Sequence, residues 1–316
     1  MEIRQLRYFV KIIEHGSMGR AATELGTTTS TLSQQVSRLE SELSTRLLLR
    51  RATGIQPTEA GSTLFKQAQL ILRQLDNATN LVQKGRLTGT VSLGLAQSTA
   101  AMLSVPFITT MNERYPGIRL RIIEGLSGHL LSLLNTRRID LAILFDDQEA
   151  RRRSAHTLLQ EELLLISAPG LPGMPEGQQI SIEQIAALPL LLPSSAHTLQ
   201  GLIVDAFRER QVEPNVAAEI DGLSTLLNAV RAGLGASIQP GSAIAGLNIT
   251  GLVLTRIVPR LVRVSHLASL SDDELSPAAL AARVVLSSVA RTLVADGKWY
   301  GANLYDGHAP RGFTKT

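Results

Sequence analysis

Apolar residues recur at helical spacing through the first ninety residues, which predicts an all-α segment before the pattern changes. The expected helices cover about 3–15, 17–25, 28–43 and 62–84. Between the third and fourth helices, RLLLRRATGIQPT has the pattern of two short strands around a turn at Thr53 and Gly54. Three helices followed by such a β-wing predict a winged helix-turn-helix domain over residues 1–58.

The third predicted helix has two contrasting faces. Leu32, Val36, Leu39 and Leu43 recur at i, i+4, i+7 and i+11, so they form one apolar stripe. The opposite face carries hydroxyls and an amide but no carboxylate, with Gln35 and Arg38 on its flanks. Short polar groups suit the base edges of a DNA major groove, which makes this the expected recognition helix. The expected DNA contacts are Thr29, Ser30, Ser33, Gln34, Ser37 and Arg38, with Arg50 and Arg51 of the wing reaching phosphates or a minor groove.

The fourth predicted helix carries a heptad seam. Its apolar residues are spaced 4, 3, 4, 3 and 4 apart, which favours pairing with a second copy of the helix. Packing against the rest of the same chain is the alternative. The expected dimerisation residues within a linker over 59–86 are Leu64, Ala68, Ile71, Leu75, Ala78 and Val82.

After Gly89 strand-like and helix-like segments alternate, which predicts a parallel sheet covered by helices. The expected strands lie near 91–96, 119–124, 141–145, 163–167, 190–192, 216–220, 236–239 and 262–270. The expected helices lie near 100–115, 128–136, 182–188, 199–211, 223–232 and 277–296. We interpret 87–296 as two α/β lobes around a cleft, the first about 90–161 and 265–296 and the second about 162–264, followed by a partly ordered tail over 297–316.

Several hydroxyl groups follow predicted strands and precede predicted helices, where a cleft between the lobes would open. Ser98 and Thr99, with the free N–H groups of the next helix, would suit a carboxylate, although capping that helix is an equal alternative. His197 is equally suited to a cap or a surface position. The expected effector contacts are Ser98, Thr99, Ser127, Ser194, Ser195, His197 and Thr198. The loops of lobe one carry no arginine clamp, so a strongly charged effector is not required, and the absence of any effector also fits.

Composition narrows the class of protein. Residues 1–90 hold twelve Lys and Arg against seven Asp and Glu, while the remainder holds nineteen against twenty, so the basic excess lies with the predicted helix-turn-helix. This favours a polyanionic partner for the first third of the chain. The chain has no cysteine, which excludes disulfides and thiolate metal sites and suits the cytoplasm. We expect no signal peptide, no apolar run approaching a membrane span, no membrane partner, no metal and no cofactor.

The motifs FVKIIEHGSMGRAATELG, LSQQVSRLESEL, LLLRRATGIQPTEAG and LTGTVSLG resemble the N-terminal region of LysR-type transcriptional regulators. The likeness continues at RYPG (114–117) and IDLAI (139–143), covers about residues 1–295, and looks most similar to the nitrogen assimilation control branch. It implies a homo-oligomer, often a dimer of dimers, with a periplasmic-binding-protein-like effector domain. Ser33, Gln34 and Arg38 stand at matching DNA-contact positions, whereas Thr29-Ser30 replaces the common Gln-Pro pair, so base preference there does not carry over.

The expected protein is therefore multidomain: a winged helix-turn-helix, a long linker helix and a two-lobed α/β effector domain. Its expected function is sequence-specific regulation of transcription at inverted-repeat operator DNA in the bacterial cytoplasm, with RNA polymerase and a small-molecule effector as candidate partners. An enzyme or a solute-binding protein is the alternative. Motifs for a P-loop, a zinc protease or a nucleophile elbow are absent, and Ser127 near His129 is a weak nucleophile pair. A solute-binding protein would have no use for residues 1–86.

Overall fold

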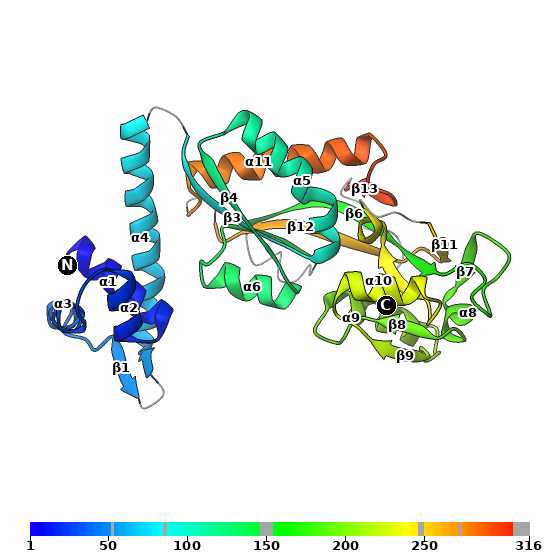
Figure 1. The fold of residues 1–316 in the computed structure, drawn as a ribbon, viewed down its shortest axis with the longest axis horizontal. Coiled ribbons are helices and arrows are strands. Elements are labelled where there is room, and N and C mark those ends of the chain that lie inside the picture. The colour runs from blue at the N-terminus through cyan, green and yellow to red at the C-terminus, as the bar shows by residue number, and fades with distance from the viewer. Residues whose placement is uncertain (52–53, 85–86, 146–153, 246–249, 272–273, 306–316) are drawn as a thin grey trace. The chain divides into compact units, whose positions relative to one another are not determined.

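The computed structural model describes residues 1–51, 54–84, 87–145, 154–245, 250–271 and 274–305. The chain divides into two compact units, Met1–Thr88 and Gly89–Thr316, and each is described by itself (Figure 1).

The N-terminal unit is a helical bundle with a β-hairpin, which confirms the predicted winged helix-turn-helix. Gly16, with a φ of 60°, ends the first helix in a left-handed conformation, and Ser17 caps the second by accepting from the N–H of Arg20. The hairpin of the unit is called the wing below. The elements are α1 (Ile3–His15), α2 (Met18–Glu24), α3 (Thr29–Glu42), β1 (Leu48–Arg51), β2 (Gly54–Pro57) and α4 (Glu59–Lys84).

The core of this unit forms where α3 lays its apolar stripe against α1 and α2. Leu32 and Val36 pack with Ile12 of α1, and Leu39 packs with Phe9. The expectation that Leu43 completes the stripe is wrong, because α3 ends at Glu42 and Leu43 is 39% exposed. Fixing the buried face of α3 in this way also fixes which residues it turns outward.

Helix α4 begins beneath the wing and packs on α1. Thr58 Oγ1 accepts a hydrogen bond from the N–H of Gly61 at 2.9 Å, so this threonine caps the start of the helix. Ala68 is fully buried in a cluster with Leu6 and Val10 of α1, and Leu64 packs against the same cluster. The assignment of Ala68 to a dimer seam is therefore wrong, since it is covered within its own unit.

Farther along α4 the apolar residues are less covered. Ile71 is 37% exposed and Leu75 is partly buried, so both retain surface that a partner could cover. The side chains of Ala78 and Val82 lie outside the described residues.

The second unit contains one long sheet and a short strand pair. In the described residues the long sheet runs β4-β3-β5-β12-β6-β11-β7, with β10 and β13 also paired to β6. Its strands are β3 (Gly89–Leu95), β4 (Ile118–Glu124), β5 (Leu141–Leu144), β6 (Ser154–Ser167), β7 (Gln179–Ser181), β10 (Ser237–Pro240), β11 (Val253–Val258), β12 (Val262–Ser269) and β13 (Ala302–Leu304). The strand pair is β8 (Leu190–Leu192) and β9 (Val216–Glu219).

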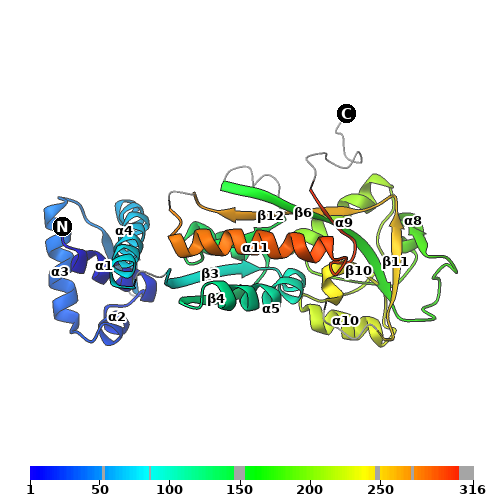
Figure 2. The same cartoon turned by 90° about the horizontal axis from the view of Figure 1, so that it is seen from above.

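Helices cover the strands of both lobes. Figures 1 and 2 show α5 and α11 on one side of β3 and β12, with α6 on the other side in Figure 1. The helical elements of this unit are α5 (Gln97–Arg114), α6 (Ser127–Asn135), α8 (Ile182–Ala186), α9 (Thr198–Glu209), α10 (Leu223–Arg231), the 3₁₀ turn η1 (Gly241–Ile244) and α11 (Pro277–Ala295). The two-lobed α/β architecture is as predicted.

The centre of the long sheet differs from the prediction. The strands β3, β4 and β5 are parallel, but β12 is antiparallel to both β5 and β6, so the purely parallel sheet is wrong. The strands β11 and β12 are separated by three residues and both pair antiparallel to β6, so they follow one another along it in the same direction. The strand β6 is also fourteen residues long rather than five, and it pairs first with β12 and then with β10 and β11. It therefore passes through both lobes.

Two further expectations concern the C-terminal part of the chain. The expectation that no segment is apolar enough to span a membrane is wrong for α11, which passes that test on length and composition alone. It packs against α5 and β3 and buries residues along its whole length, so here it is a core helix. Part of the predicted tail belongs to the fold, because Trp299 is buried and β13 pairs with β6.

Candidate nucleic-acid interface and inter-lobe pocket

The N-terminus of α3 is held in place by a hydroxyl cap. Thr28 Oγ1 accepts from the N–H of Thr31 at 3.2 Å, which starts the helix at Thr29. The buried stripe then leaves the polar positions outside. Exposed on this surface and on the wing are Thr29, Ser30, Gln34, Ser37, Arg38, Arg50 and Arg51, and Ser33 is partly exposed. By contrast, Gln35, expected on the flank of this face, is buried with 7% exposure.

The wing is tied closely to α3. Glu40 Oε1 accepts hydrogen bonds from the N–H groups of Leu47 and Leu48 at 2.7 and 3.1 Å. Arg50 donates from Nη2 to Ser33 Oγ at 2.7 Å. The sequence pattern assigned these two side chains to separate roles, but the structure brings them into contact.

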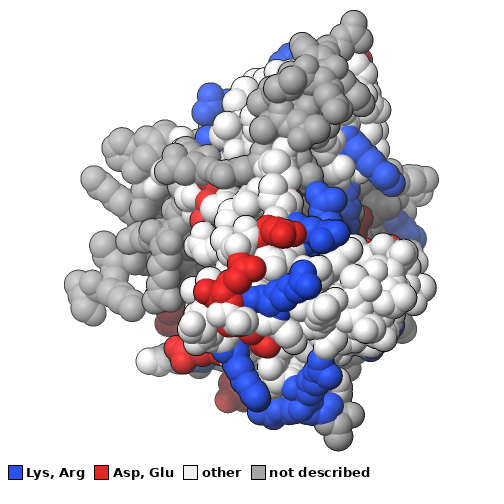
Figure 3. Space-filling model, turned by 90° about the vertical axis from the view of Figure 1, so that its left-hand side faces the viewer, with Lys and Arg blue, Asp and Glu red and all other residues white. Residues whose placement is uncertain are grey.

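The charges of this unit favour a polyanion. Glu24 is paired with Lys11 and His15, so its pKa is lowered and that of Lys11 is raised, both chiefly through the hydrogen bond between Lys11 and Glu24. Within the residues that the structure describes, Arg38, Arg46, Arg50 and Arg51 form no ion pair with a carboxylate. Figure 3 shows Lys and Arg side chains along the lower edge and right half of one face, with Asp and Glu mostly between its centre and left.

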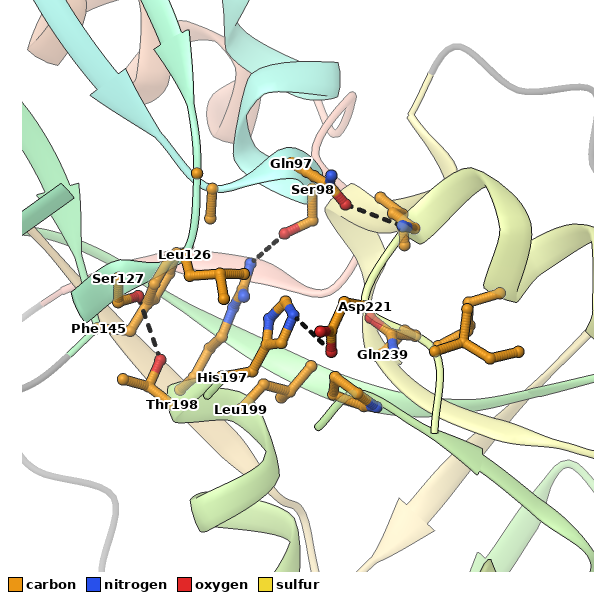
Figure 4. Close-up of a pocket in the computed structure, with 17 residues that line it drawn as sticks. Gln97, Ser98, Leu126, Ser127, Phe145, His197, Thr198, Leu199, Asp221 and Gln239 are labelled. Carbon is orange, nitrogen blue, oxygen red and sulfur yellow. Dashed lines mark hydrogen bonds and ion pairs between the residues drawn. The ribbon is translucent and has the colours of Figure 1, made fainter. Parts of the chain in front are cut away.

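A pocket of about 60 Å³ lies between the two lobes of the second unit (Figure 4). One water molecule needs about 10–15 Å³ of such space, so the pocket as it stands admits a ligand the size of a few waters. Several helices begin at its edge: α5 at Gln97, α6 at Ser127, α9 at Thr198 and α10 at Leu223. Their first N–H groups have no partner within the helix, so the pocket is lined by potential donors.

Two contacts already link the lobes across this pocket. The Ser127 and Thr198 hydroxyls lie 3.3 Å apart, and Gln97 Oε1 accepts from the N–H of Leu223 at 2.8 Å. Figure 4 shows Ser127 and Thr198 pointing toward each other. Both pairs join residues from opposite sides of the cleft, so a ligand entering there meets an arrangement that is already hydrogen-bonded.

A buried arginine reaches the pocket from β12. Arg263 is 6% exposed and donates through Nη2 to Glu161 Oε2 at 2.6 Å, to Ser98 Oγ at 3.1 Å and to Ser242 Oγ at 3.2 Å. Its guanidinium carbon lies 4.0 Å from the centre of the Phe145 ring. No sequence pattern indicated this arginine, because it lies on a strand far from the strand-to-helix loops. Its charge is already balanced by Glu161, so the pocket still does not require a strongly charged ligand.

An acidic group and an imidazole lie on the lobe-two side. His197 Nε2 lies 3.4 Å from Asp221 Oδ1 and has no partner with hydrogen-bond geometry among the described residues. The N–H of Ser194, its hydroxyl and the nearby His197 hold the pKa of Asp221 below its usual range. Sequence reasoning missed both Asp221 and Gln239: Asp221 stands in the β9–α10 junction, which has no hydroxyl residue before the helix, and Gln239 lies within β10.

The expected effector residues fall into two groups. Ser98, Ser127, His197 and Thr198 line the pocket. The remaining three do not line it: Thr99 is buried in α5, Ser194 binds Asp221 through its N–H, and Ser195 is exposed elsewhere.

The alternative that Ser98 or Thr99 caps α5 is wrong, and the alternative that His197 caps a helix holds for its position only. The N-cap of α5 is Ala96, which leaves Ser98 and Thr99 inside the first turn. His197 occupies the N-cap position of α9 without a side-chain cap bond. Among the described residues no group of three or more His, Asp or Glu side chains could hold a metal ion.

Comparisons with known proteins identify both units. Residues 3–62 match the family described as "Bacterial regulatory helix-turn-helix protein, lysR family", and residues 84–291 match "LysR substrate binding domain". The nitrogen assimilation regulatory protein nac of Escherichia coli (strain K12) is 33% identical over 294 residues, which cover 92% of this chain and 95% of that protein. The resemblance seen in the sequence is confirmed.

Solved structures share the fold. A full-length OxyR variant from Pseudomonas aeruginosa aligns with a TM-score of 0.73 at 24% identity, covering 92% of this chain and 95% of that chain. Full-length CbnR complexed with its target DNA aligns with a TM-score of 0.61 at 22% identity, covering 92% and 100% of the two chains. The chain therefore belongs to the LysR family, whose members are DNA-binding transcriptional regulators and not enzymes.

Proposed function

We propose that this regulator binds inverted-repeat operator DNA as a homodimer, or as a dimer of such dimers, through α3 and the wing of residues 1–58. The observation that carries the proposal is the outward surface of α3, where hydroxyl and amide groups stand beside arginines that form no ion pair with a carboxylate among the described residues. Thr29, Ser30, Gln34 and Ser37 supply the groups that suit base edges, and Arg38 and Arg51 supply charge for phosphates.

The DNA interface is tested by selecting bound fragments from random duplexes with the full-length chain. We expect enrichment of a two-fold related sequence, and a Kd that rises steeply with salt because phosphate contacts release counterions. Gln34→Ala should change the selected sequence, whereas Arg208→Ala, an exposed arginine of the second unit, should change neither sequence nor affinity. Failure to enrich any sequence over random competitor would contradict the proposed interface.

For self-association we propose the part of α4 beyond its contact with α1, within the linker of residues 59–86. The helix has 26 residues and so extends roughly 39 Å at 1.5 Å per residue. Leu64 and Ala68 belong to the unit's own core, so the seam starts at Ile71 and continues through Leu75. Ala78 and Val82 continue the same heptad register in the sequence. Two paired chains would present two recognition helices, which supports an inverted repeat as the target.

For regulation we propose that a small polar molecule binds in the inter-lobe pocket of residues 87–296, in contact with Ser98, Ser127, His197 and Thr198. Lining groups from both lobes support this, because a ligand that touches both can bind one arrangement of the lobes better than another. A protein that acts on bacterial DNA works in the cytoplasm, and RNA polymerase is the further partner of the proposal.

A further inference from the structure

We propose that Arg50 and Ser33 act together as a reader of guanine in the DNA major groove. The inference rests on the proposed DNA interface of α3 and the wing. It replaces the sequence-based expectation that Arg50 reaches phosphates or a minor groove while Ser33, among other residues of α3, contacts base edges without it.

The position of Arg50 over α3 is built into the fold. On β1, Arg50 pairs with Ile55 of β2. The Ile55 side chain packs against the α1–α3 core, and its N–H donates to Gly16 O at 2.9 Å. At the other end of the wing, Glu40 of α3 accepts from the backbone that leads into β1. The wing is thus attached to the helices on both sides. From this fixed strand the Arg50 side chain extends to Ser33, and its Nη2 lies 2.7 Å from Ser33 Oγ.

This contact decides what the Ser33 hydroxyl can still do. A guanidinium only donates, so Ser33 Oγ is the acceptor and its own O–H must point elsewhere. Helical hydroxyls often donate to the carbonyl four residues earlier, as Thr23, Thr63 and Thr110 do here. Among the described residues Ser33 forms no such bond. Its hydroxyl hydrogen is therefore available to an outside acceptor.

Together the two side chains present donors only. Arg50 keeps N–H groups beyond the one bound to Ser33, and Ser33 adds its O–H. In the major groove, guanine shows two acceptors, N7 and O6, and no donor. Adenine and cytosine each show an amino donor, and thymine shows one acceptor beside a methyl group. Guanine is the base edge that matches the pair.

The test is a double-mutant comparison on the selected operator, with the full-length chain and all four base pairs at each position. We expect one position in each half-site where the wild type prefers guanine by about 10- to 100-fold. Arg50→Ala and Ser33→Ala should each remove most of that preference, and the double variant should lose no more than either single variant. Arg50→Lys should keep affinity but lose the preference, because an ammonium lacks the planar fork.

Arg51→Ala is the matched control, since this neighbouring wing arginine is exposed and forms no hydrogen bond or ion pair with α3 among the described residues. It should weaken binding equally for every sequence. The slope of log K against log salt concentration should become shallower by about one, as expected for the loss of one phosphate contact. If Arg50→Ala also weakened binding equally for every sequence, or if the effects of Arg50→Ala and Ser33→Ala on base preference were additive, the proposed joint reading of guanine would be wrong. The operator and the proposed function would not be affected by that result. Absence of any selected operator would instead contradict the proposed function itself.

Discussion

Replacement of Glu161 by Gln should unfold the second unit at markedly lower temperature. Glu161 is 1% exposed, and both of its oxygens are in use: Oε2 binds Arg263, and Oε1 accepts from Trp299 Nε1 at 2.6 Å. A glutamine keeps the shape but carries one acceptor and one amino group. Either Trp299 or Arg263 would then face a donor, and Arg263 would lose the charge that balances its own.

The size of the effect follows from the burial of the arginine. Removing one partner of a buried ion pair costs about 3–5 kcal/mol, because the remaining charge stays out of water. Ser98 and Ser242 still accept from Arg263, which places the expectation near the lower end of that range. For a unit of this size, 1 kcal/mol corresponds to about 2–4 °C in Tm, so the predicted loss is roughly 6–12 °C or more.

Trp299 is the only tryptophan of the chain, so its fluorescence on heating reports this unit directly. Glu162→Gln is the control, since Glu162 pairs at 3.0 Å with the exposed Arg260 and should lose under about 1 kcal/mol. Glu161→Gln combined with Arg263→Met removes both charges and should recover at least half of the loss. Equal Tm values for the two glutamine variants, or no recovery in the double variant, would refute the reasoning.

Three further predictions concern the N-terminal unit. Leu75→Asp should convert dimers to monomers by sedimentation velocity, because it places a charge on the proposed seam of α4, whereas Gln67→Asp at an exposed position off the seam should not. Gly61→Ala should lower the free energy of unfolding in urea by about 1–3 kcal/mol, since the added Cβ would lie 2.0 Å from the backbone oxygen of Leu47. Gly128→Ala is the control: its Cβ has no neighbouring heavy atom within 4 Å, so it should be neutral or stabilising. Because the folded-state pKa of Glu24 is lowered, its contribution is fully present above the ordinary carboxyl pKa and is lost as the pH falls through the lowered value. Glu24→Gln should therefore flatten the acid side of a plot of unfolding midpoint against pH.

The sequence predicted the elements whose signals are local. Helix α3 could be predicted from the spacing of its apolar residues, of which Leu32, Val36 and Leu39 are buried as expected, and the wing from a strand-turn-strand pattern only a dozen residues long. The outward face of α3 follows from the same spacing, so exposure of Gln34 and Arg38 was predictable. The contact of Arg50 with Ser33 was not, because it depends on how the wing folds back over the helix.

The errors lie where distant segments meet. Glu161 and Arg263 are directly opposite each other in the β6–β12 register, 102 residues apart in the chain, and β13 brings Ala302 to the other side of Glu161. No local pattern marks an arginine on a strand as part of a pocket. The first half of β6 was missed for the same reason, since its polar residues look like a loop until their strand partners are known. Ala68 was misassigned because a heptad seam and an intramolecular core contact share the same spacing.

The geometry of the pocket also limits how an effector can act. The lobes already hold each other through Ser127 with Thr198 and through Gln97 with the N–H of Leu223, so an entering ligand gains only what exceeds these bonds. A ligand that supplies an acceptor to the Leu223 N–H would replace the Gln97 contact rather than add to it. Because β6 passes through both lobes and is joined to β12 by the buried Glu161–Arg263 pair, a change in lobe angle must bend strands that this pair fixes in register. The response to an effector should therefore be a small rotation about these two strands, and its free energy should come from contacts made to both lobes at once.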